Sequence, residues 1–262
     1  MMTPAPDLAA LLDPVCAIAG GAGRVVLRLR NQSMKIQPKA DGSPSTAADE
    51  ASEAHIVKML RLLTPSYPII AEEEVSRGVA VDIANKPFWL IDPLDATRDF
   101  IAGEAEFCIN IALIIDNQPV LGAIYAPALD EMYFGAQGVG VFCQKGIRPP
   151  DPISGRIAND TRMSVISSRH HGDEAGLSAY LSNLPIKQHK RMSSALKFCE
   201  VAAGRADLYP RFGRAMAWDV AAGHALVVLA GGTVTTVNGQ PLQYRTPDFQ
   251  ISNFIARTRF SG

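Results

Sequence analysis

Two aspartates three residues apart, Asp92 and Asp95, are the strongest candidates for chemistry in this sequence. They follow an apolar run at residues 88–91 that has the character of a strand, and Pro93 turns the chain between them. Their carboxylate oxygens can therefore converge on one point, where two buried anions repel each other unless a cation lies between them. A hard divalent ion with oxygen ligands would meet that need. The alternative is that Asp92 ends a strand and Asp95 caps the next helix.

Three other acidic residues could join this pair, and each also has a purely structural interpretation. Glu72 ends a short apolar segment, and strands of one sheet tend to end at the same edge, which would bring Glu72 beside Asp92. Otherwise it belongs to a solvated acidic turn. Asp219 begins a helix of small residues, which it could cap or carry into a cleft. Asp49 follows Thr46 by three residues, as in a capping box, and could also orient a hydroxyl group.

The elements that must position these residues are predicted by hydrophobic periodicity and turn signals. Apolar spacing of three and four residues predicts helices at 8–30 and 46–63. In the first half, strands are predicted at 69–70, 88–91, 107–115, 120–125, 131–135 and 140–142. In the second half, we expect strands at 163–167 and 206–209, helices at 173–181, 194–203 and 219–229, and a hairpin at 238–239. The pattern predicts a layered α/β fold of the mixed, α+β kind.

A proline-rich segment, residues 148–155, is the best candidate for a boundary in the chain. It separates an N-terminal α+β subdomain, residues 1–154, from a C-terminal α/β subdomain, residues 155–262, which would complete the active site. A chain of 262 residues can form one large domain or two small ones that share an interface.

Composition and charge exclude several classes of protein. A formal net charge of −1 gives no electrostatic basis for binding nucleic acid or an anionic membrane. The four cysteines are far apart in the sequence, which argues against zinc or redox motifs and favours reduced thiols in a cytoplasmic protein. The first residues do not form a signal peptide, and the apolar stretch at 220–230 is too short to span a bilayer. We therefore expect a soluble, cytoplasmic protein without an integral membrane segment.

Four motifs resemble, in order and spacing, the signatures of the inositol monophosphatase superfamily of magnesium-dependent, lithium-sensitive phosphatases. They are DGSPSTAAD at 41–49, AEEE at 71–74, WLIDPLDATRDF at 89–100 and WDVAAG at 218–223. Within the superfamily, the chain is most similar to the bacterial 3'(2'),5'-bisphosphate nucleotidases. That similarity rests on residues 97–101, 106–113, 125–127, 193–199, 208–213 and 218–224. The resemblance covers residues 39–245 and implies an alternating α-β-α-β-α sandwich of two subdomains.

The resemblance also implies a magnesium site with two or three ions. One Mg²⁺ would be bound by Glu72, Asp92 and the backbone carbonyl of Leu94. A second would be bound by Asp92, Asp95 and Asp219, so that Asp92 bridges the two ions. Magnesium keeps several waters in its octahedral shell, and substrate phosphate oxygens can replace them.

For the reaction, the resemblance implies that Thr97, hydrogen-bonded to Asp49, orients the attacking water beside Glu72, with Glu73 in support. Adenosine 3',5'-bisphosphate would be converted to AMP and phosphate as part of sulfate assimilation, and its sulfated analogue would be a second substrate. The implied substrate contacts are Lys39, Asp95, Ala96, Thr97, Ser194, Lys197, Arg211 and Asp219.

Two positions separate this chain from parts of the family. Inositol-selective relatives have a glutamate where this chain has the neighbourhood of Arg211, and a cation there favours a second phosphate over a neutral polyol. We expect Lys197 or Lys39 to assist Arg211 in that contact. Ala96 replaces a family glycine; at a helix start we expect its backbone near the right-handed conformation, so that the cost of alanine is small. The added methyl group could still narrow the phosphate pocket.

Two alternative functions stay open at this point. One is a phosphatase for inositol phosphates or sugar bisphosphates, and the other is a nucleotide-binding protein with little turnover. The chain would act as a monomer or homodimer, and any association with the cytoplasmic face of an inner membrane would be peripheral. We expect the adjacent His170 and His171 to lie in a loop or beside the substrate rather than to bind metal. His224 is expected to be a packed helix residue.

Overall fold

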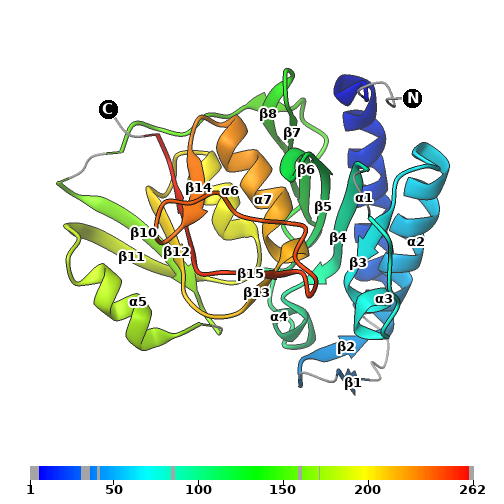
Figure 1. Ribbon diagram of the computed structural model, residues 1–262, viewed down its shortest axis with the longest axis horizontal. Helices are drawn as coiled ribbons and strands as arrows, with labels where there is room; N and C mark the ends of the chain where they lie inside the picture. Colours follow the sequence, from blue (N-terminus) through cyan, green and yellow to red (C-terminus); the bar gives the residue numbers. More distant parts are fainter. Residues whose placement is uncertain are drawn as a thin grey trace.

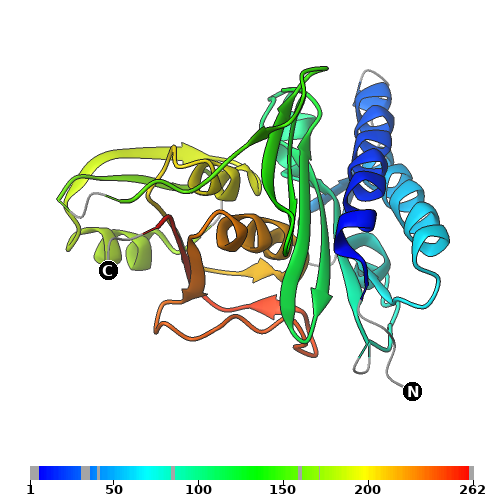
Figure 2. The same cartoon turned by 90° about the horizontal axis from the view of Figure 1, so that it is seen from above.

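Helices and two β-sheets alternate in five layers, as predicted (Figures 1 and 2). The computed structural model describes residues 6–30, 36–39, 42–83, 86–158, 161–170 and 172–259. The helices are α1 (Leu8–Arg30), α2 (Ala47–Leu63), α3 (Glu72–Ser76), α4 (Thr97–Ile101), α5 (Glu174–Leu181), α6 (Leu196–Ala202) and α7 (Ala217–Leu229). Helices α1 and α2 form one outer layer, α6 and α7 the middle layer, and α5 the other outer layer.

The first sheet has seven strands, and its order follows the sequence from β3 to β9. The strands are β3 (Ile69–Ala71), β4 (Phe88–Asp95), β5 (Cys108–Ile115), β6 (Gln118–Ala126), β7 (Glu131–Ala136), β8 (Gly140–Lys145) and β9 (Asp151–Pro152). β3 and β4 run parallel, and the remaining pairs are antiparallel. β4 packs against α2 on one face and α7 on the other, which explains why its sequence is a continuous apolar run rather than an alternating one.

The second sheet has five strands in the order β11-β10-β12-β16-β14. The strands are β10 (Met163–Ser168), β11 (Ile186–Met192), β12 (Leu208–Arg211), β14 (Thr233–Thr236) and β16 (Phe254–Arg257). Two pairs of short strands stand apart, β1 (Ile36–Pro38) with β2 (Pro44–Thr46), and β13 (Ala215–Met216) with β15 (Gln250–Ile251). The turn predicted at Asn238–Gly239 is confirmed, since Thr235 pairs antiparallel with Pro241 across it.

Helix α7 lies between the two sheets and gives them a common core. That core contains Leu90 and Ile124 of the first sheet together with Phe254 of the second and Phe198 of α6. Gly223 lets α7 pack closely against α6, because a β-carbon at this position would lie 2.2 Å from the ring of Phe198. A second core fills the space between α1, α2 and the other face of the first sheet.

Within the described residues, one helix, α1, is long and apolar enough to cross a membrane by length and composition alone. Its buried residues include Val15, Ala19 and Ala22, which belong to the core between α1, α2 and the first sheet. The segment 148–155 adds β9 to the edge of the first sheet before the chain crosses to the second. The division of the chain at residues 154 and 155 stays a prediction.

Candidate active site

A cavity of about 370 Å³ opens between the two halves of the molecule and collects nearly all the predicted site residues. It lies where β3 and β4 end, opposite the first turns of α6 and α7. Predicted site residues on its wall are Glu72, Asp92, Leu94, Asp95, Ala96, Thr97, Ser194, Lys197, Arg211 and Asp219. Asp49 and Lys39 are not among the lining residues.

The turn at Pro93 brings the first two aspartates to the cavity. The pairing of β4 with β5 is irregular between Asp92 and Asp95, which lets both residues line the cavity. The N–H of Leu94 donates to Asp92 Oδ1 at 3.0 Å, and Ser52 Oγ donates to the carbonyl of Pro93 at 2.8 Å. These bonds fix the turn. The capping alternative for Asp95 does not hold, because the N-cap residue of α4 is the next one in the chain.

Glu72 reaches Asp92 in the way that the strand order predicts. β3 and β4 are parallel neighbours with Ala71 opposite Ile91, so the next residues lie side by side, Glu72 at the start of α3 and Asp92 still within β4. Asp219 enters from the other half on the first turn of α7, where its Oδ2 accepts the N–H of Met216 at 2.9 Å.

The four cavity carboxylates disfavour one another's charge. Burial raises the pKa of Asp92 well above its ordinary value, and Glu72, Asp95 and Asp219 raise it further by repulsion. Burial raises the pKa of Asp219 to about 8, with repulsion from Asp95 and Glu72 adding to the effect. Burial also raises the pKa of Glu72, while its contact with Lys39 opposes the rise. Clustered carboxylate oxygens of this kind are hard donors, which Mg²⁺ prefers.

These carboxylates fit a metal by chemistry, but in the described part of the chain no three acidic, histidine or cysteine groups already form a metal cage. Each of the four carboxylates accepts a hydrogen bond from another group of the protein. Asp95 Oδ2 accepts the N–H of Ala195 and lies 3.3 Å from Asn110 Nδ2. Glu72 Oε1 lies 2.6 Å from Lys39 Nζ. Metal binding would therefore exchange protein donors for a cation.

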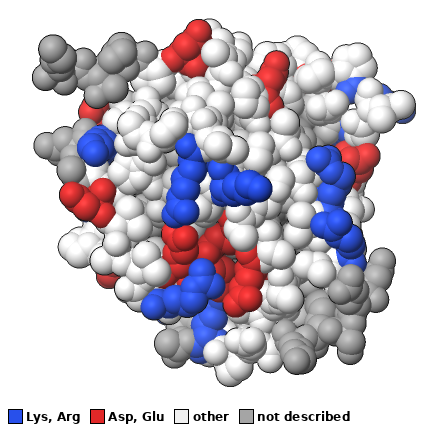
Figure 3. Space-filling view, turned by 90° about the vertical axis from the view of Figure 1, so that its right-hand side faces the viewer, with Lys and Arg blue, Asp and Glu red and all other residues white. Residues whose placement is uncertain are grey.

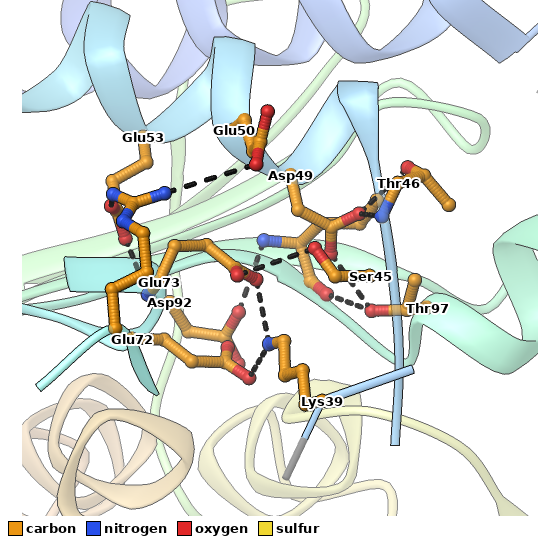
Figure 4. A network of polar contacts seen from close by, with 12 residues as sticks. Lys39, Ser45, Thr46, Asp49, Glu50, Glu53, Glu72, Glu73, Asp92 and Thr97 are labelled. Carbon is orange, nitrogen blue, oxygen red and sulfur yellow. Dashed lines mark hydrogen bonds and ion pairs between the residues drawn. The ribbon is translucent and has the colours of Figure 1, made fainter. Parts of the chain in front are cut away.

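Lys39 lies within the carboxylate cluster rather than on the cavity wall, and its contact with the substrate stays a prediction (Figure 4). Its Nζ is 2.6 Å from both Glu72 Oε1 and Glu73 Oε1. Burial opposes the charge of Lys39, but the two carboxylates outweigh it and raise its pKa. The contact with Glu73 lacks hydrogen-bond geometry, which leaves Glu73 Oε1 as a buried oxygen without a hydrogen-bond partner.

Thr97 and Asp49 form the hydrogen bond that the sequence predicts. Thr97 Oγ1 lies 3.0 Å from Asp49 Oδ1 and 3.0 Å from the carbonyl oxygen of Leu94, and its single proton serves one acceptor at a time. The capping box is confirmed: Thr46 donates to Asp49 Oδ2 through its N–H at 2.8 Å and its hydroxyl at 2.7 Å. Burial raises the pKa of Asp49 to about 6, and the bonds from Thr46 limit the rise.

The expectation for Ala96 is wrong. Its φ of 69° and ψ of 49° place it in the left-handed region, not near the right-handed helical conformation. The chain must turn sharply between the end of β4 and the start of α4, and Ala96 is the residue that turns it. Glycine adopts this conformation without strain, which explains why the family has glycine where this chain has Ala96. Ser194, opposite it in the cavity, is also left-handed, with φ 56°.

Two cations with fixed positions, Arg211 and Lys197, line the same cavity as the carboxylates. Arg211 donates to Ser168 Oγ at 2.8 Å and to the carbonyl of Arg214 at 2.6 Å. Its charge also opposes the rise in the pKa of Asp219. Lys197 is 4% exposed, donates to the carbonyl of Ser194 and lies 5.3 Å from the ring centre of Tyr209. Both cations therefore have set positions.

A polar network that sequence reasoning missed joins the two halves beside the cavity. Asp99 Oδ1 accepts Arg169 Nη1 at 3.1 Å and Ser193 Oγ at 3.0 Å. Glu106 Oε2 accepts Arg169 Nη2 at 2.8 Å and the N–H of Ser193 at 2.9 Å. For Arg169 the available signal was its place just after the strand predicted at 163–167, whereas β11, which Ser193 follows, has no hydrophobic period that could have shown the shared sheet edge.

Among the described residues, no histidine joins the carboxylate cluster. His170 lines the cavity 3.4 Å from Asp99, which agrees with the expected substrate-side place, and His171 lies outside the described residues. His224 is packed in α7, as expected, where its Nδ1 lies 2.7 Å from the hydroxyl of Tyr244.

The alternating sandwich and its acidic cavity define an enzyme class, hydrolases of phosphate esters that work with bound metal ions. The chain belongs to the inositol monophosphatase family, which it matches over residues 7–260. It is 41% identical to the 3'(2'),5'-bisphosphate nucleotidase CysQ of Escherichia coli K12, over 92% of this chain and 99% of that protein. It is 31% identical to bovine inositol monophosphatase 1, over 88% of this chain and 84% of that protein.

A solved structure agrees with this assignment. The crystal structure of CysQ from Bacteroides thetaiotaomicron, described as a bacterial member of the inositol monophosphatase family, superimposes with a TM-score of 0.77. The two sequences are 29% identical, and the superposition covers 96% of this chain and 98% of that one.

Proposed function

We propose that this chain is a cytoplasmic 3'(2'),5'-bisphosphate nucleotidase that converts adenosine 3',5'-bisphosphate to AMP and phosphate in sulfate assimilation. The sulfated analogue of the bisphosphate would be a second substrate. The observation that carries the proposal is the cavity itself, which holds a carboxylate cluster together with two fixed cations, Arg211 and Lys197. The cluster suits a metal-bound phosphate, and the cations suit a second phosphate on the same molecule. The similarity to the CysQ nucleotidases supports the same substrate.

The metal in this proposal is Mg²⁺, with two or three ions in the cavity. Glu72, Asp92, the carbonyl of Leu94, Asp95 and Asp219 would hold them. When bound, Mg²⁺ neutralises phosphoryl charge, lowers the pKa of a nearby water and stabilises the leaving oxygen. Removal of Mg²⁺ by a chelator should therefore abolish phosphate release.

The side chains around the metals have separate roles in this mechanism. Thr97 accepts a hydrogen bond from the attacking water and passes its own proton toward Asp49, which lies 3.0 Å away. Asp49 is the acceptor for this proton, and burial raises its pKa to about 6. Water adds to phosphorus and loses one proton through Thr97 to Asp49, the bond from phosphorus to the ribose 3'-oxygen breaks, and that oxygen takes up one proton from solvent water. Glu72 orients the same water from the other side.

The N–H groups of Ala96 and Thr97 and the side chains of Ser194 and Lys197 are proposed to contact the substrate. They line one cavity together, and the α4 backbone begins at Ala96. Backbone N–H groups at the first turn of a helix are suited to bind phosphate oxygens.

A substrate panel tests the function directly. Phosphate release would be measured with Mg²⁺, with and without Li⁺, from adenosine 3',5'-bisphosphate, its sulfated analogue, inositol 1-phosphate and fructose 1,6-bisphosphate. We expect the highest kcat/KM for the adenosine bisphosphate and inhibition by Li⁺. A higher kcat/KM for inositol 1-phosphate or fructose 1,6-bisphosphate would reject the nucleotidase assignment. Release from none of the four would reject an enzyme in favour of a nucleotide-binding protein.

The role of Arg211 can be separated from the chemistry by the choice of substrate. Arg211→Ala should raise KM for adenosine 3',5'-bisphosphate about tenfold, which corresponds to one charge-assisted hydrogen bond. Adenosine 3'-monophosphate lacks the 5'-phosphate, so its KM should change little. Arg211→Lys keeps the charge but loses the paired N–H donors of the guanidinium, so its KM for the bisphosphate should lie between those of the wild type and Arg211→Ala. An unchanged KM for the bisphosphate in Arg211→Ala would remove Arg211 from the substrate site.

A further inference from the structure

Helix α3 carries Glu72 as its first residue, yet it cannot cap its own N-terminus. Its N-cap residue is Ala71, whose methyl side chain has no hydrogen-bonding atom. The buried carboxylate of Glu53, which comes from α2, supplies the missing acceptor, because Glu53 Oε2 accepts the N–H of Glu73 at 2.7 Å. The N-terminal turn that holds Glu72 is therefore capped by another helix (Figure 4).

The same carboxylate also reaches the other end of α3. Glu53 Oε1 accepts Arg77 Nη2 at 3.2 Å, and Arg77 is the C-cap residue of the helix. α3 is only five residues long, so these two contacts attach both of its ends to one side chain of the long helix α2. The position of Glu72 in the cavity thus depends on a residue outside the cavity.

The two contacts of Glu53 have different environments. Figure 3 views the molecule from the side of α2 and α3, where acidic side chains gather in the middle of the face and basic ones border them. A surface pocket there is lined by Glu50, Glu53, Glu74, Lys58, Arg61 and Arg77. Arg77 is 53% exposed, whereas the side chain of Glu53 is 4% exposed. Solvent weakens the contact with Arg77, so the bond to the buried N–H of Glu73 is the stronger one.

We infer that Glu53 is a positioning residue for the metal site, which holds the first turn of α3 so that Glu72 meets Asp92. This inference rests on the proposed magnesium site but not on the identity of the nucleotide. Loss of a side chain that holds a metal ligand in place typically weakens metal binding by about ten- to a hundredfold. Glu53 should act on Mg²⁺ affinity more than on KM for the substrate at saturating Mg²⁺.

The experiment compares Glu53→Ala with Glu53→Gln and with a matched control, Glu50→Gln. Glu50 lies one turn earlier on α2 and 3.9 Å from Arg77, and no contact with the α3 N-terminus is seen among the described residues. Mg²⁺ binding without substrate would be followed by tryptophan fluorescence, since Trp218 lines the cavity beside Asp219. KM and kcat would be measured on the same proteins.

We expect Glu53→Ala to weaken Mg²⁺ binding about tenfold. Glu53→Gln should recover most of the affinity, because its amide oxygen can still accept the N–H of Glu73, and Glu50→Gln should match the wild type. Wild-type Mg²⁺ affinity in folded Glu53→Ala would overturn the inference, as would equal loss in the Glu50 control. If Glu53→Ala does not fold, Glu53→Asp takes its place: its shorter side chain cannot span the same distance, and wild-type affinity in that variant would equally overturn the inference.

The result is separable from the proposed function. A wild-type protein that binds Mg²⁺ but prefers another phosphate ester would reject the nucleotidase assignment and leave the role of Glu53 to be decided by the variants. A wild-type protein that does not bind Mg²⁺ would overturn both.

Discussion

At the scale of single residues, Ala96 is a non-glycine residue with an unfavourable, left-handed backbone conformation. Its φ of 69° is one that glycine adopts freely and that costs an alanine about 1 kcal/mol or more. It lies between Asp95 and Thr97, so the strain is held beside two residues of the proposed mechanism. The surrounding turn, fixed by the bonds of Leu94 and Pro93, keeps the residue there.

Ala96→Gly should therefore stabilise the protein by about 1 kcal/mol, measured by urea unfolding. KM for the bisphosphate should stay equal or fall, because the change removes a methyl group from the cavity wall. Ala102→Gly is the matched control: Ala102 ends the same helix with φ −71°, where glycine should cost about 0.5–1 kcal/mol. A less stable Ala96→Gly protein would contradict this account of the turn.

The residues that sequence reasoning placed well are those fixed by strand ends and spacing. Glu72 follows β3, Asp92 lies beside it near the end of the parallel strand β4, and Asp95 ends that strand, so their convergence could be predicted from the pattern. The positions of Lys39 and Ala96 could not. The first depends on which of several nearby charges a flexible side chain pairs with, and the second on a single backbone angle at the start of α4.

At the scale of elements, α7 shows how a helix is adapted to lie between two sheets. Its small residues let it approach both, and its one imidazole, His224, is buried against the hydroxyl of Tyr244. Burial lowers the pKa of His224 from its ordinary value of 6.5 to about 4. The folded protein therefore keeps this ring neutral at pH values where the unfolded chain takes up a proton.

This difference predicts a loss of stability in mild acid. Above pH 6.5 the ring is neutral in both states and adds no pH dependence. As the pH falls from 6.5 toward 4, only the unfolded state binds the proton, so His224 should remove about 2 kcal/mol of unfolding free energy between pH 7 and pH 5. Urea unfolding of the wild type and His224→Gln at both pH values would show it. Equal pH dependence in the two proteins would exclude His224 as the source.

Two strands, β11 and β16, could not be predicted from the sequence because neither shows a clear hydrophobic pattern typical of a strand. β11 reads IKQHKRM and is mostly exposed at the edge of the second sheet, so it carries neither an apolar run nor alternation. β16 is four residues long, and it becomes a strand because β12 and β14 pair with it on both sides. Both are defined by their neighbours rather than by local sequence.

At the scale of the whole molecule, the polar network beside the cavity connects the two halves. Asp99 and Glu106 belong to the first half, and Arg169 and Ser193 to the second. Two residues after Ser193, the N–H of Ala195 donates to Asp95. The network therefore sets the distance between Asp95, a proposed metal ligand in one half, and the loop at residues 193–195 in the other.

Arg169→Ala should leave Asp99, which is 3% exposed, without its main positive partner. We expect a loss of about 2 kcal/mol in unfolding free energy, less than for a fully buried pair because Arg169 is one-third exposed. Arg191→Ala is the control, since its pair with Glu174 lies on the surface, where solvent screening should make the loss of stability much smaller. Chemical denaturation would measure the unfolding free energy of both variants. Equal losses would show that the Arg169 network contributes no more stability than a surface ion pair.

The core that α7 shares between the sheets also bears on how the chain could be divided. A cut in the segment 148–155 would leave the first fragment with one face of its seven-stranded sheet uncovered, because α6 and α7 belong to the second fragment. Each fragment would then present to water an apolar surface that its counterpart is shaped to cover. We expect the two pieces to aggregate when produced separately and to recover a folded heterodimer when produced together. We therefore expect the protein to tolerate a break in the backbone at this boundary, although neither half should fold without the other.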